Sequence, residues 1–376
     1  MRIVVKVGTS TLTYENGKLN LEIMEKLVRQ IANLLNRGEE VILVTSGAIG
    51  AGMGKLNLKE KPKTIPQKQS LAAIGQGLLI EIYEKFFNEY GKITAQVLLT
   101  KEDFSDRKRY LNVSYALSNL LKWGVVPIIN ENDTVTVDEI KIGDNDTLAA
   151  LVASLVEADL LIILTDIDGL YDKDPRLYKD AKVIEVVEEF SDELLKIAGG
   201  AGTKRGTGGM YTKIQAAKIC FNSGVKMIIA NGKIDHVLNR IVSGEKIGTT
   251  FLPMKNPINS RKIWIAFNAK VSGFLFIDEG AAKAIVKQGK SLLPSGIVKT
   301  EGDYDVGDCV AVIDYQEKEI ARGLINYSSE EVKKIKGCKT HEIETILGYK
   351  YYDEVIHRDN LVILERGESY GKSYGS

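Results

Sequence analysis

Six carboxylates fall within residues 130–147, and the only basic residue in that stretch is Lys141. An apolar run precedes the stretch and another follows it. Carboxylates crowded beside buried segments are costly unless they accept hydrogen bonds, begin a helix or meet a cationic ligand. Helix capping, with Asp146 as the N-cap, explains one or two of them. It does not explain residues 130–133, which follow a predicted strand. We therefore predict a functional site in this stretch.

Two lysines are candidates for binding an anion. Lys6 interrupts an apolar strand predicted over residues 2–7, just before Gly-Thr-Ser. A lysine in such a strand must reach water, a carboxylate or an anion, and the simplest alternative is that it reaches solvent. Lys213 lies one turn into a helix predicted over residues 210–222, from which it can extend back over the preceding loop. The alternative for Lys213 is an ordinary surface lysine.

That preceding loop, residues 199–209, is rich in glycine. Glycines let backbone N–H groups approach a phosphate closely, and a helix N-terminus favours anions. No Gly-Lys is followed by Ser or Thr at the spacing of a Walker A loop, and a flexible surface loop is the alternative. Ser46 and Asp166 also follow predicted strands, where a plain turn and a plain cap are the alternatives. Lysines, glycine turns and carboxylates gathered at strand ends favour phosphoryl transfer by charge neutralisation.

Composition narrows the class of protein. Of 376 residues, 50 are Lys or Arg and 50 are Asp or Glu, so no bulk attraction to nucleic acid or an anionic membrane is implied. Three scattered cysteines indicate reduced thiols rather than disulfides or a zinc site. No run approaches the ~20 apolar residues of a membrane span. A strand that begins at residue 2 leaves no room for a signal peptide, so we expect a cytoplasmic protein.

Strands and helices are predicted to alternate as far as Leu252 and to position these side chains. We expect strands over 2–7, 41–44, 93–99, 125–129, 160–164, 182–187 and 225–230, and helices over 20–37, 67–87, 104–121, 148–156 and 210–222. Such alternation predicts an α/β fold, a three-layer αβα sandwich with a mostly parallel sheet. Ligands of open α/β sheets bind at the C-terminal ends of the strands.

The pattern changes after Leu252. Residues 253–260, with two prolines and two asparagines, are typical of a linker. Short apolar runs separated by turns follow, the first at 263–267, with one helix at 278–287. They predict a small, mainly β domain. We therefore divide the chain into a domain over 1–254, a second domain with its extension over 261–364, and a polar tail over 366–376 that we predict to be disordered.

Several segments together resemble the amino-acid kinase family, and within it the members that phosphorylate glutamate. They are residues 4–10, 44–49, 68–69, 75–76, 106–112, 130–134, 143–146, 165–166 and 206–213. The C-terminal region is similar to the PUA domain that many of these members carry, notably at 291–296 and 320–337. The resemblance covers nearly the whole chain except the tail. It implies ATP-dependent phosphorylation of the glutamate side-chain carboxylate, giving glutamyl 5-phosphate and ADP, the first step of proline biosynthesis.

The resemblance also implies roles for matching positions. Glutamate would be held by Ser46, Asp133 and Asn145, with Asp144 and Asp146 close by. ATP would be bound by Lys6, Thr165, Asp166, Thr207, Gly208, Gly209, Met210, Tyr211, Thr212 and Lys213. Mg²⁺ would accompany ATP, with no metal site of the protein's own. We further predict that Asp166 pairs with both Lys6 and Lys213 and keeps them aimed, which makes these three the catalytic residues.

The implied partners are glutamate, ATP and further copies of the chain, in a dimer or a tetramer. Whether proline inhibits the enzyme is left open. Two alternative functions also remain. The first is another kinase of the same fold, acting on acetylglutamate, aspartate, carbamate or UMP. The second is an RNA-binding protein that works through its PUA-like domain, which the balanced charge and the lack of an aromatic stacking array disfavour.

Overall fold

A computed structural model describes residues 1–14, 18–135, 145–175, 177–190, 209–254, 262 and 264–364. The chain forms two compact units, one of residues 1–103 and 108–258 and the other of residues 104–107 and 259–376. The predicted boundaries at 254 and 261 remain a prediction. The predicted tail, 366–376, lies outside the described residues.

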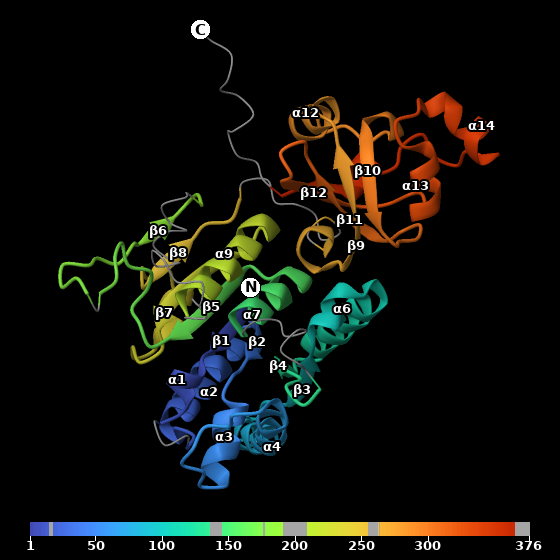
Figure 1. Ribbon diagram of the computed structural model, residues 1–376. Helices are drawn as coiled ribbons and strands as arrows, with labels where there is room; N and C mark the ends of the chain where they lie inside the picture. The colour runs from blue at the N-terminus through green and yellow to red at the C-terminus, as the bar shows by residue number, and fades with distance from the viewer. Residues whose placement is uncertain are drawn as a thin grey trace. The chain divides into compact units, whose positions relative to one another are not determined.

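An eight-stranded sheet forms the centre of the first unit (Figure 1). The strands follow the order β3-β4-β2-β1-β5-β7-β8-β6. Among the described strands every pair is parallel except β7 with β8. Their bounds are β1 (Arg2–Val7), β2 (Glu40–Val44), β3 (Thr94–Leu99), β4 (Val126–Glu131), β5 (Leu160–Thr165), β6 (Val186–Val187), β7 (Lys226–Asn231) and β8 (Thr249–Phe251). Strand β1 is central, so its C-terminal end lies within the sheet rather than at a margin.

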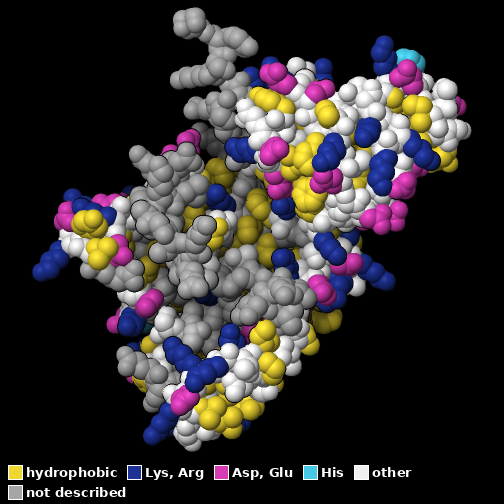
Figure 2. All heavy atoms as spheres, viewed as in Figure 1, with side chains coloured by type: hydrophobic (Ala, Val, Ile, Leu, Met, Phe, Trp, Pro, Cys, Tyr) yellow, Lys and Arg dark blue, Asp and Glu magenta, His cyan; other side chains and the backbone are white. Residues whose placement is uncertain are grey.

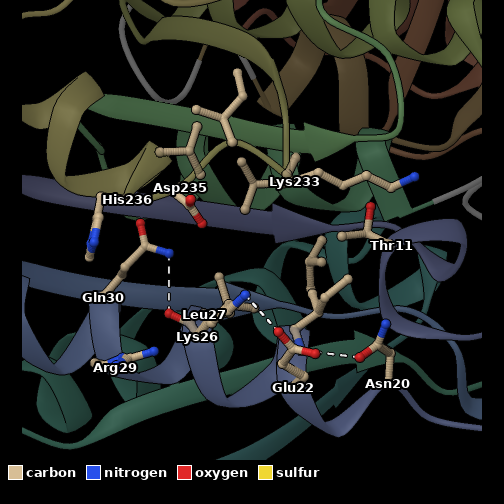
Figure 3. Close-up of a pocket in the computed structure, with 16 residues that line it drawn as sticks. Thr11, Asn20, Glu22, Lys26, Leu27, Arg29, Gln30, Lys233, Asp235 and His236 are labelled. Carbon is tan, nitrogen blue, oxygen red and sulfur yellow. Dashed lines mark hydrogen bonds and ion pairs between the residues drawn. The ribbon is translucent and has the colours of Figure 1, made fainter.

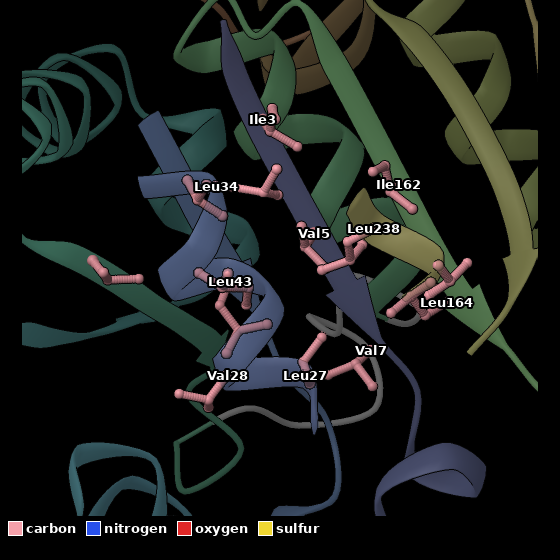
Figure 4. Packing of buried hydrophobic residues seen from close by; sticks show 14 of the residues in the cluster. Ile3, Val5, Val7, Leu27, Val28, Leu34, Leu43, Ile162, Leu164 and Leu238 are labelled. Atoms are coloured by element: carbon pink, nitrogen blue, oxygen red, sulfur yellow. The ribbon is translucent and has the colours of Figure 1, made fainter. Parts of the chain in front are cut away.

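Helices cover both faces of this sheet, as a three-layer αβα sandwich requires. On one face the apolar side chains of α2 (Leu21–Asn36), α4 (Ile65–Glu89) and α10 (Val237–Val242) form one core with Val5, Leu43 and Ile162. Figure 4 shows members of this core from α2, α10 and the strands. Helices α7 (Asn145–Leu155) and α9 (Met210–Ser223) pack along one another, against β1 and β7 (Figure 1). The fold class predicted from the sequence is confirmed.

Some predicted elements differ in detail from the structure. The single helix expected over 104–121 is two helices, α5 (Lys101–Ser105) and α6 (Arg107–Lys122), which break at Asp106 without any glycine or proline to signal it. The strand expected over 182–187 is reduced to β6. Strand β4 continues through Asn130 and Glu131, both buried, which the sequence placed after the strand. Asp146 is not an N-cap, because α7 already begins at Asn145.

The second unit contains a five-stranded sheet in the order β10-β9-β11-β12-β13. Its elements are β9 (Val271–Ile277), α12 (Glu279–Gln288), β10 (Ile297–Gly302), β11 (Cys309–Ile313), β12 (Glu319–Leu324), α13 (Ser329–Ile335), α14 (Ile343–Leu347) and β13 (Leu361–Ile363). The expected small, mainly β domain is confirmed. Basic and acidic side chains are interspersed on the face of each unit that Figure 2 shows, in keeping with their equal numbers.

The apolar run at 263–267, one of the runs that predict the β domain, does not form a strand in its described part. Its described part belongs to a π-helix, Trp264–Asn268, in which the Ala269 N–H donates to the Trp264 carbonyl over 2.8 Å. A hydrogen bond across five residues defines this helix type. Short apolar runs do not distinguish a buried strand from a buried helical turn, so periodicity alone favoured the wrong element.

Two glycines let α3 (Ala48–Lys55) and α4 approach to backbone contact. A Cβ on Gly75 would lie 1.7 Å from the Ala48 oxygen, and one on Gly52 would lie 2.1 Å from the Leu71 oxygen. Gly47, the N-cap of α3, has a φ of 98°, which suits glycine. Helix α4 therefore fixes the turn that follows β2.

We predict that Gly75→Ala lowers the free energy of unfolding by about 1–3 kcal/mol, because a methyl group has no room there. At Gly77, in the same helix, nothing lies within 4 Å of the place that an added methyl group would take. Gly77→Ala should instead leave stability unchanged or raise it by about 0.5–1 kcal/mol. Urea unfolding followed by circular dichroism measures both variants. Equal effects would contradict the close helix contact.

Candidate functional site

Two lysines and one carboxylate meet in the interior beside the C-terminal end of β1. Lys6 Nζ lies 2.6 Å from Asp146 Oδ1, and Lys213 Nζ lies 2.9 Å from Asp146 Oδ2. The three side chains are 8%, 9% and 1% exposed for Lys6, Lys213 and Asp146. One negative charge thus faces two positive charges. The buried cluster has a net charge of about +1 at neutral pH.

Three elements deliver these side chains to one place. Alternation along β1 turns Lys6 away from the face where Val5 and Val7 pack, and so toward α7. Asp146 and Lys213 each lie in the first turn of their helix, and α7 packs along α9. Lys213 Nζ also donates to the Gly209 oxygen over 3.0 Å, which holds the start of α9 against the cluster.

Electrostatics keeps the Asp146 carboxyl ionised. Its burial alone would raise its pKa, but the charges of Lys6 and Lys213 and their hydrogen bonds outweigh burial and hold the pKa below its ordinary value. The Thr212 hydroxyl donates to Asp146 Oδ2 as well, over 3.2 Å. The carboxylate is therefore a fixed counter-ion for both lysines.

The predicted pairing of Asp166 with the two lysines is wrong. Asp166 is exposed after β5, where its Oδ1 accepts a hydrogen bond from Thr165 Oγ1 over 3.1 Å. Asp146, which the sequence prediction assigned to substrate binding, holds the lysines instead. In the sequence, Asp146 lies at the start of a predicted helix and Asp166 lies just after a predicted strand, so neither position identifies the partner of the lysines. Only the packing of α7 beside β1 distinguishes them.

A cleft of about 440 Å³ opens at the C-terminal ends of β2 and β4. Three residues predicted for substrate binding line it together: Ser46, Asp133 and Asn145. Sequence reasoning missed the site role of Lys61, and of Lys68 beyond its membership of a resembling segment, although both also line the cleft. A lone lysine in a polar segment gives no signal that separates a site residue from a surface residue.

Amide side chains form the polar floor of this cleft. Asn145 Nδ2 lies 2.7 Å from the Thr45 oxygen, 2.9 Å from Ser46 Oγ and 2.9 Å from Asn130 Oδ1. Asn130 Nδ2 in turn donates to Gln76 Oε1 over 2.8 Å. The network joins the ends of β2 and β4 to the first turn of α7, so Asn145 is held in one orientation.

The remaining predicted residues divide into two groups. Asp144, Thr207 and Gly208 lie outside the described residues. Apart from Lys6 on β1, the described candidates for nucleotide binding lie on two segments. These are the end of β5 with Thr165 and Asp166, and the start of α9 with Gly209, Met210, Tyr211, Thr212 and Lys213. Thr165 is buried, and its carbonyl accepts from the Gly232 N–H over 2.8 Å.

A second cavity of about 420 Å³ lies between α2 and the loop before α10 (Figure 3). No residue predicted for the site lines this cavity, as far as the described residues show. Its buried glutamine, Gln30, is hydrogen-bonded at both amide atoms, to the Lys26 oxygen over 3.1 Å and from the Leu238 N–H over 3.0 Å. This cavity is therefore not the site that the sequence predicted.

In the described part of the chain, no three His, Cys, Asp or Glu side chains are grouped so as to hold a metal ion. Within the same residues, none of the helices combines the length and the apolar character that crossing a membrane requires.

Comparison with known proteins finds matches to the family that the sequence resembles, and they cover nearly the whole chain. The amino acid kinase family model matches residues 1–231, and the PUA domain model matches residues 273–347. A glutamate 5-kinase of Thermoanaerobacter sp. (strain X514) is 92% identical over 371 residues, 99% of this chain and 100% of the relative. One from Caldanaerobacter subterraneus subsp. tengcongensis is 89% identical over the same shares. One from Moorella thermoacetica is 54% identical over 96% of each chain.

We predict that Asp146→Asn lowers the free energy of unfolding at pH 7 by about 3–5 kcal/mol, because two buried ammonium groups lose their counter-ion. The folded-state pKa of Asp146 lies below the unfolded value of about 3.9. Its contribution is therefore complete above that value and is lost as the pH falls below it. Urea unfolding at a series of pH values should show the two proteins converging in acid.

Asp166→Asn is the matched control for this prediction. Because the Asp166 side chain is exposed, its replacement should change stability by no more than about 0.5 kcal/mol. A gap between Asp146→Asn and wild type that stays constant down to acid pH would contradict the charge assignment.

Proposed function

The chain belongs to the glutamate 5-kinases of the amino acid kinase family, and from this premise we propose which residues carry out its reaction. The family predicted from the sequence is thereby confirmed. The enzyme uses ATP to phosphorylate glutamate, the first step of proline biosynthesis. Relatives named glutamate 5-kinase extend from 92% to 54% identity, which favours glutamate over the substrates of the other kinases of this fold.

The single observation that carries the proposal is the buried cluster of Lys6, Asp146 and Lys213. A preformed positive site stabilises charge that develops on phosphate oxygens without having to reorganise during the reaction. Lys213 is proposed to bind oxygens on the leaving ADP side, and Lys6 oxygens of the transferring phosphoryl group. Asp146 is the positioning residue that keeps both ammonium groups in place. Charge shifts between these oxygens as the bond breaks, so fixed cations favour the transition state over the ground state.

The chemistry itself needs no general base. The side-chain carboxylate of glutamate is ionised at neutral pH. One of its oxygens attacks the γ-phosphorus in line, the bond from that phosphorus to the bridging oxygen breaks, and the electron pair leaves with ADP. No proton moves. The protein must bring two anions together, and this is chiefly a problem of charge and position.

Glutamate is proposed to bind in the cleft that Ser46, Asp133 and Asn145 line, and the shared lining supports this assignment. The Asp133 carboxylate would face the ammonium group of the substrate. An N-acylated amino acid has no such charge, so this contact would select the free amino acid. Asn145 and Asp146 are consecutive residues of α7, so the cleft directly adjoins the lysine cluster.

Mg²⁺ is the proposed divalent ion of a kinase that uses ATP. Each Asp146 oxygen faces a lysine, so this carboxylate is not offered to a metal. The ion would therefore be held through the phosphates of ATP, which is how Mg²⁺ commonly enters such sites. When bound, it supplies further neutralisation of phosphate charge. The chain's own part is to hold the nucleotide between the end of β5 and the start of α9.

Further proposals rest on the resemblance to the family. They are a homo-oligomer, dimeric or tetrameric, a cytoplasmic location, and inhibition by proline as the regulation to test. Gel filtration with light scattering measures the first, and steady-state rates with added proline measure the last.

We predict that Lys6→Met and Lys213→Met each lower kcat by about 10²–10³, the usual effect of losing one preorganised donor. Asp146→Asn should also lower kcat, because both ammonium groups lose their position. The double lysine variant should lose less than the product of the single losses, since the residues act as a unit. Glutamyl phosphate trapped by hydroxylamine gives the rates, and circular dichroism checks folding.

Asp166→Asn serves as the control for these variants. It should change the KM for ATP more than it changes kcat, since the Asp166 carboxylate holds neither lysine. Near-normal kcat in a folded Lys→Met variant would refute the proposed mechanism.

Asn145→Ala should raise the KM for glutamate at least tenfold and leave the KM for ATP within about twofold, because it removes binding to one substrate. Asn119→Ala, at an exposed position of α6, is the control and should change neither constant. An equal rise in both Michaelis constants after Asn145→Ala would place this residue outside the glutamate site.

A further inference from the structure

We propose that Gln76, which does not line the cleft, is a positioning residue that turns the Asn145 carbonyl oxygen toward the ammonium group of glutamate. The inference rests on the proposed glutamate site and adds a determinant of its specificity. Gln76 lies within α4 and is 9% exposed. It acts through Asn130, so it need not contact the substrate.

A chain of amide groups runs from Gln76 to the cleft. Gln76 Oε1 accepts from Asn130 Nδ2 over 2.8 Å, and Asn130 Oδ1 accepts from Asn145 Nδ2 over 2.9 Å. Asn130 is 2% exposed, so water has little access to the middle of the chain. Among the described residues, Asn130 Nδ2 and Gln76 Oε1 therefore depend on each other for a hydrogen-bond partner.

Backbone groups fix which way every amide points. The Glu131 N–H, which only donates, lies 2.9 Å from Asn130 Oδ1, and the Thr45 carbonyl, which only accepts, lies 2.7 Å from Asn145 Nδ2. These two contacts identify the oxygen of Asn130 and the nitrogen of Asn145. The Asn130 nitrogen must then point at Gln76, and Gln76 must present its oxygen. Neither Asn130 nor Asn145 can flip without losing a contact to the backbone, and Gln76 cannot flip without losing its hydrogen bond to Asn130.

The orientation decides what the cleft offers a ligand. Asn145 Nδ2 is directed inward to the Thr45 oxygen, Ser46 Oγ and Asn130 Oδ1. Its carbonyl oxygen is then left for the cleft that Asn145 lines. Ser46 Oγ accepts from Asn145, so its hydroxyl hydrogen can donate to a ligand. An acceptor beside a donor suits the ammonium and carboxylate groups of a free amino acid.

The amide nitrogen of Gln76 has an environment that indicates a role in function rather than in stability. Gln76 Nε2 is buried and has no hydrogen-bond partner among the described residues. A buried donor without an acceptor destabilises a fold. By contrast, Gln30 of α2, which is equally buried, has partners at both amide atoms. The position of the Gln76 side chain thus satisfies only its oxygen, which accepts the hydrogen bond from Asn130.

The test compares Gln76→Leu with Gln76→Glu, which keeps an oxygen acceptor, and with Gln30→Leu as the matched buried control. Gln76→Leu should raise the KM for glutamate about tenfold, equivalent to about 1.4 kcal/mol of binding. Its kcat and its KM for ATP should stay within about twofold. Gln76→Glu should restore the glutamate KM to near the wild-type value, and Gln30→Leu should leave it unchanged.

Glutarate, which is glutamate without its ammonium group, separates positioning from simple distortion. In competition with glutamate, glutarate should have the same inhibition constant in wild type and Gln76→Leu. Glutarate has no ammonium group, so it cannot lose a contact with the Asn145 carbonyl oxygen. Parallel rises for glutamate and glutarate would overturn the inference. If glutarate does not inhibit, the split between the two Michaelis constants and the rescue by Gln76→Glu decide the question.

Asn145→Ala, measured alongside, separates this inference from the proposed function. If it raises the glutamate KM while Gln76→Leu does not, the amide chain is not a determinant and the glutamate site stands. If neither variant raises it, the proposed glutamate site is itself wrong.

Discussion

The ion pairs of Asp146 with Lys6 and Lys213 are the constraint on which the rest of the site depends. Three buried charges are tolerated only when every one has a partner at close range. The partners come from β1, α7 and α9, so a central strand and two helices must converge with little freedom. The parallel sheet meets this demand because its strands end along one edge, from which the following helices start.

Consecutive residues at the start of α7 serve two different neighbourhoods. The Asn145 side chain reaches the amide floor of the cleft, and the Asp146 side chain reaches the lysine cluster. One helical turn thus lies between the proposed sites for the acceptor and for the transferred phosphoryl group. A small rotation of α7 would misplace both, and packing of α7 against β1 and α9 opposes such a rotation.

The sequence predicted the architecture well because apolar periodicity reports burial directly. Lys6 was also predictable, since an ion inside an apolar strand demands a partner. Its partner was not, because Asp146 and Asp166 look alike until tertiary packing brings one of them to the lysines. Gln76 and Asn130 are 54 residues apart, and no local pattern connects them. The prediction also failed for the π-helix that begins at Trp264, because a short apolar run does not show whether it forms a strand or a helical turn.

The shared first turn of α7 also has a thermodynamic consequence. Any ligand that steadies this turn from one side changes the cost of ordering it for a ligand on the other side. Equilibrium linkage then makes the coupling reciprocal, so the factor by which nucleotide changes glutamate affinity equals the factor by which glutamate changes nucleotide affinity. A single helical turn can in this way make the affinities for the two substrates depend on each other.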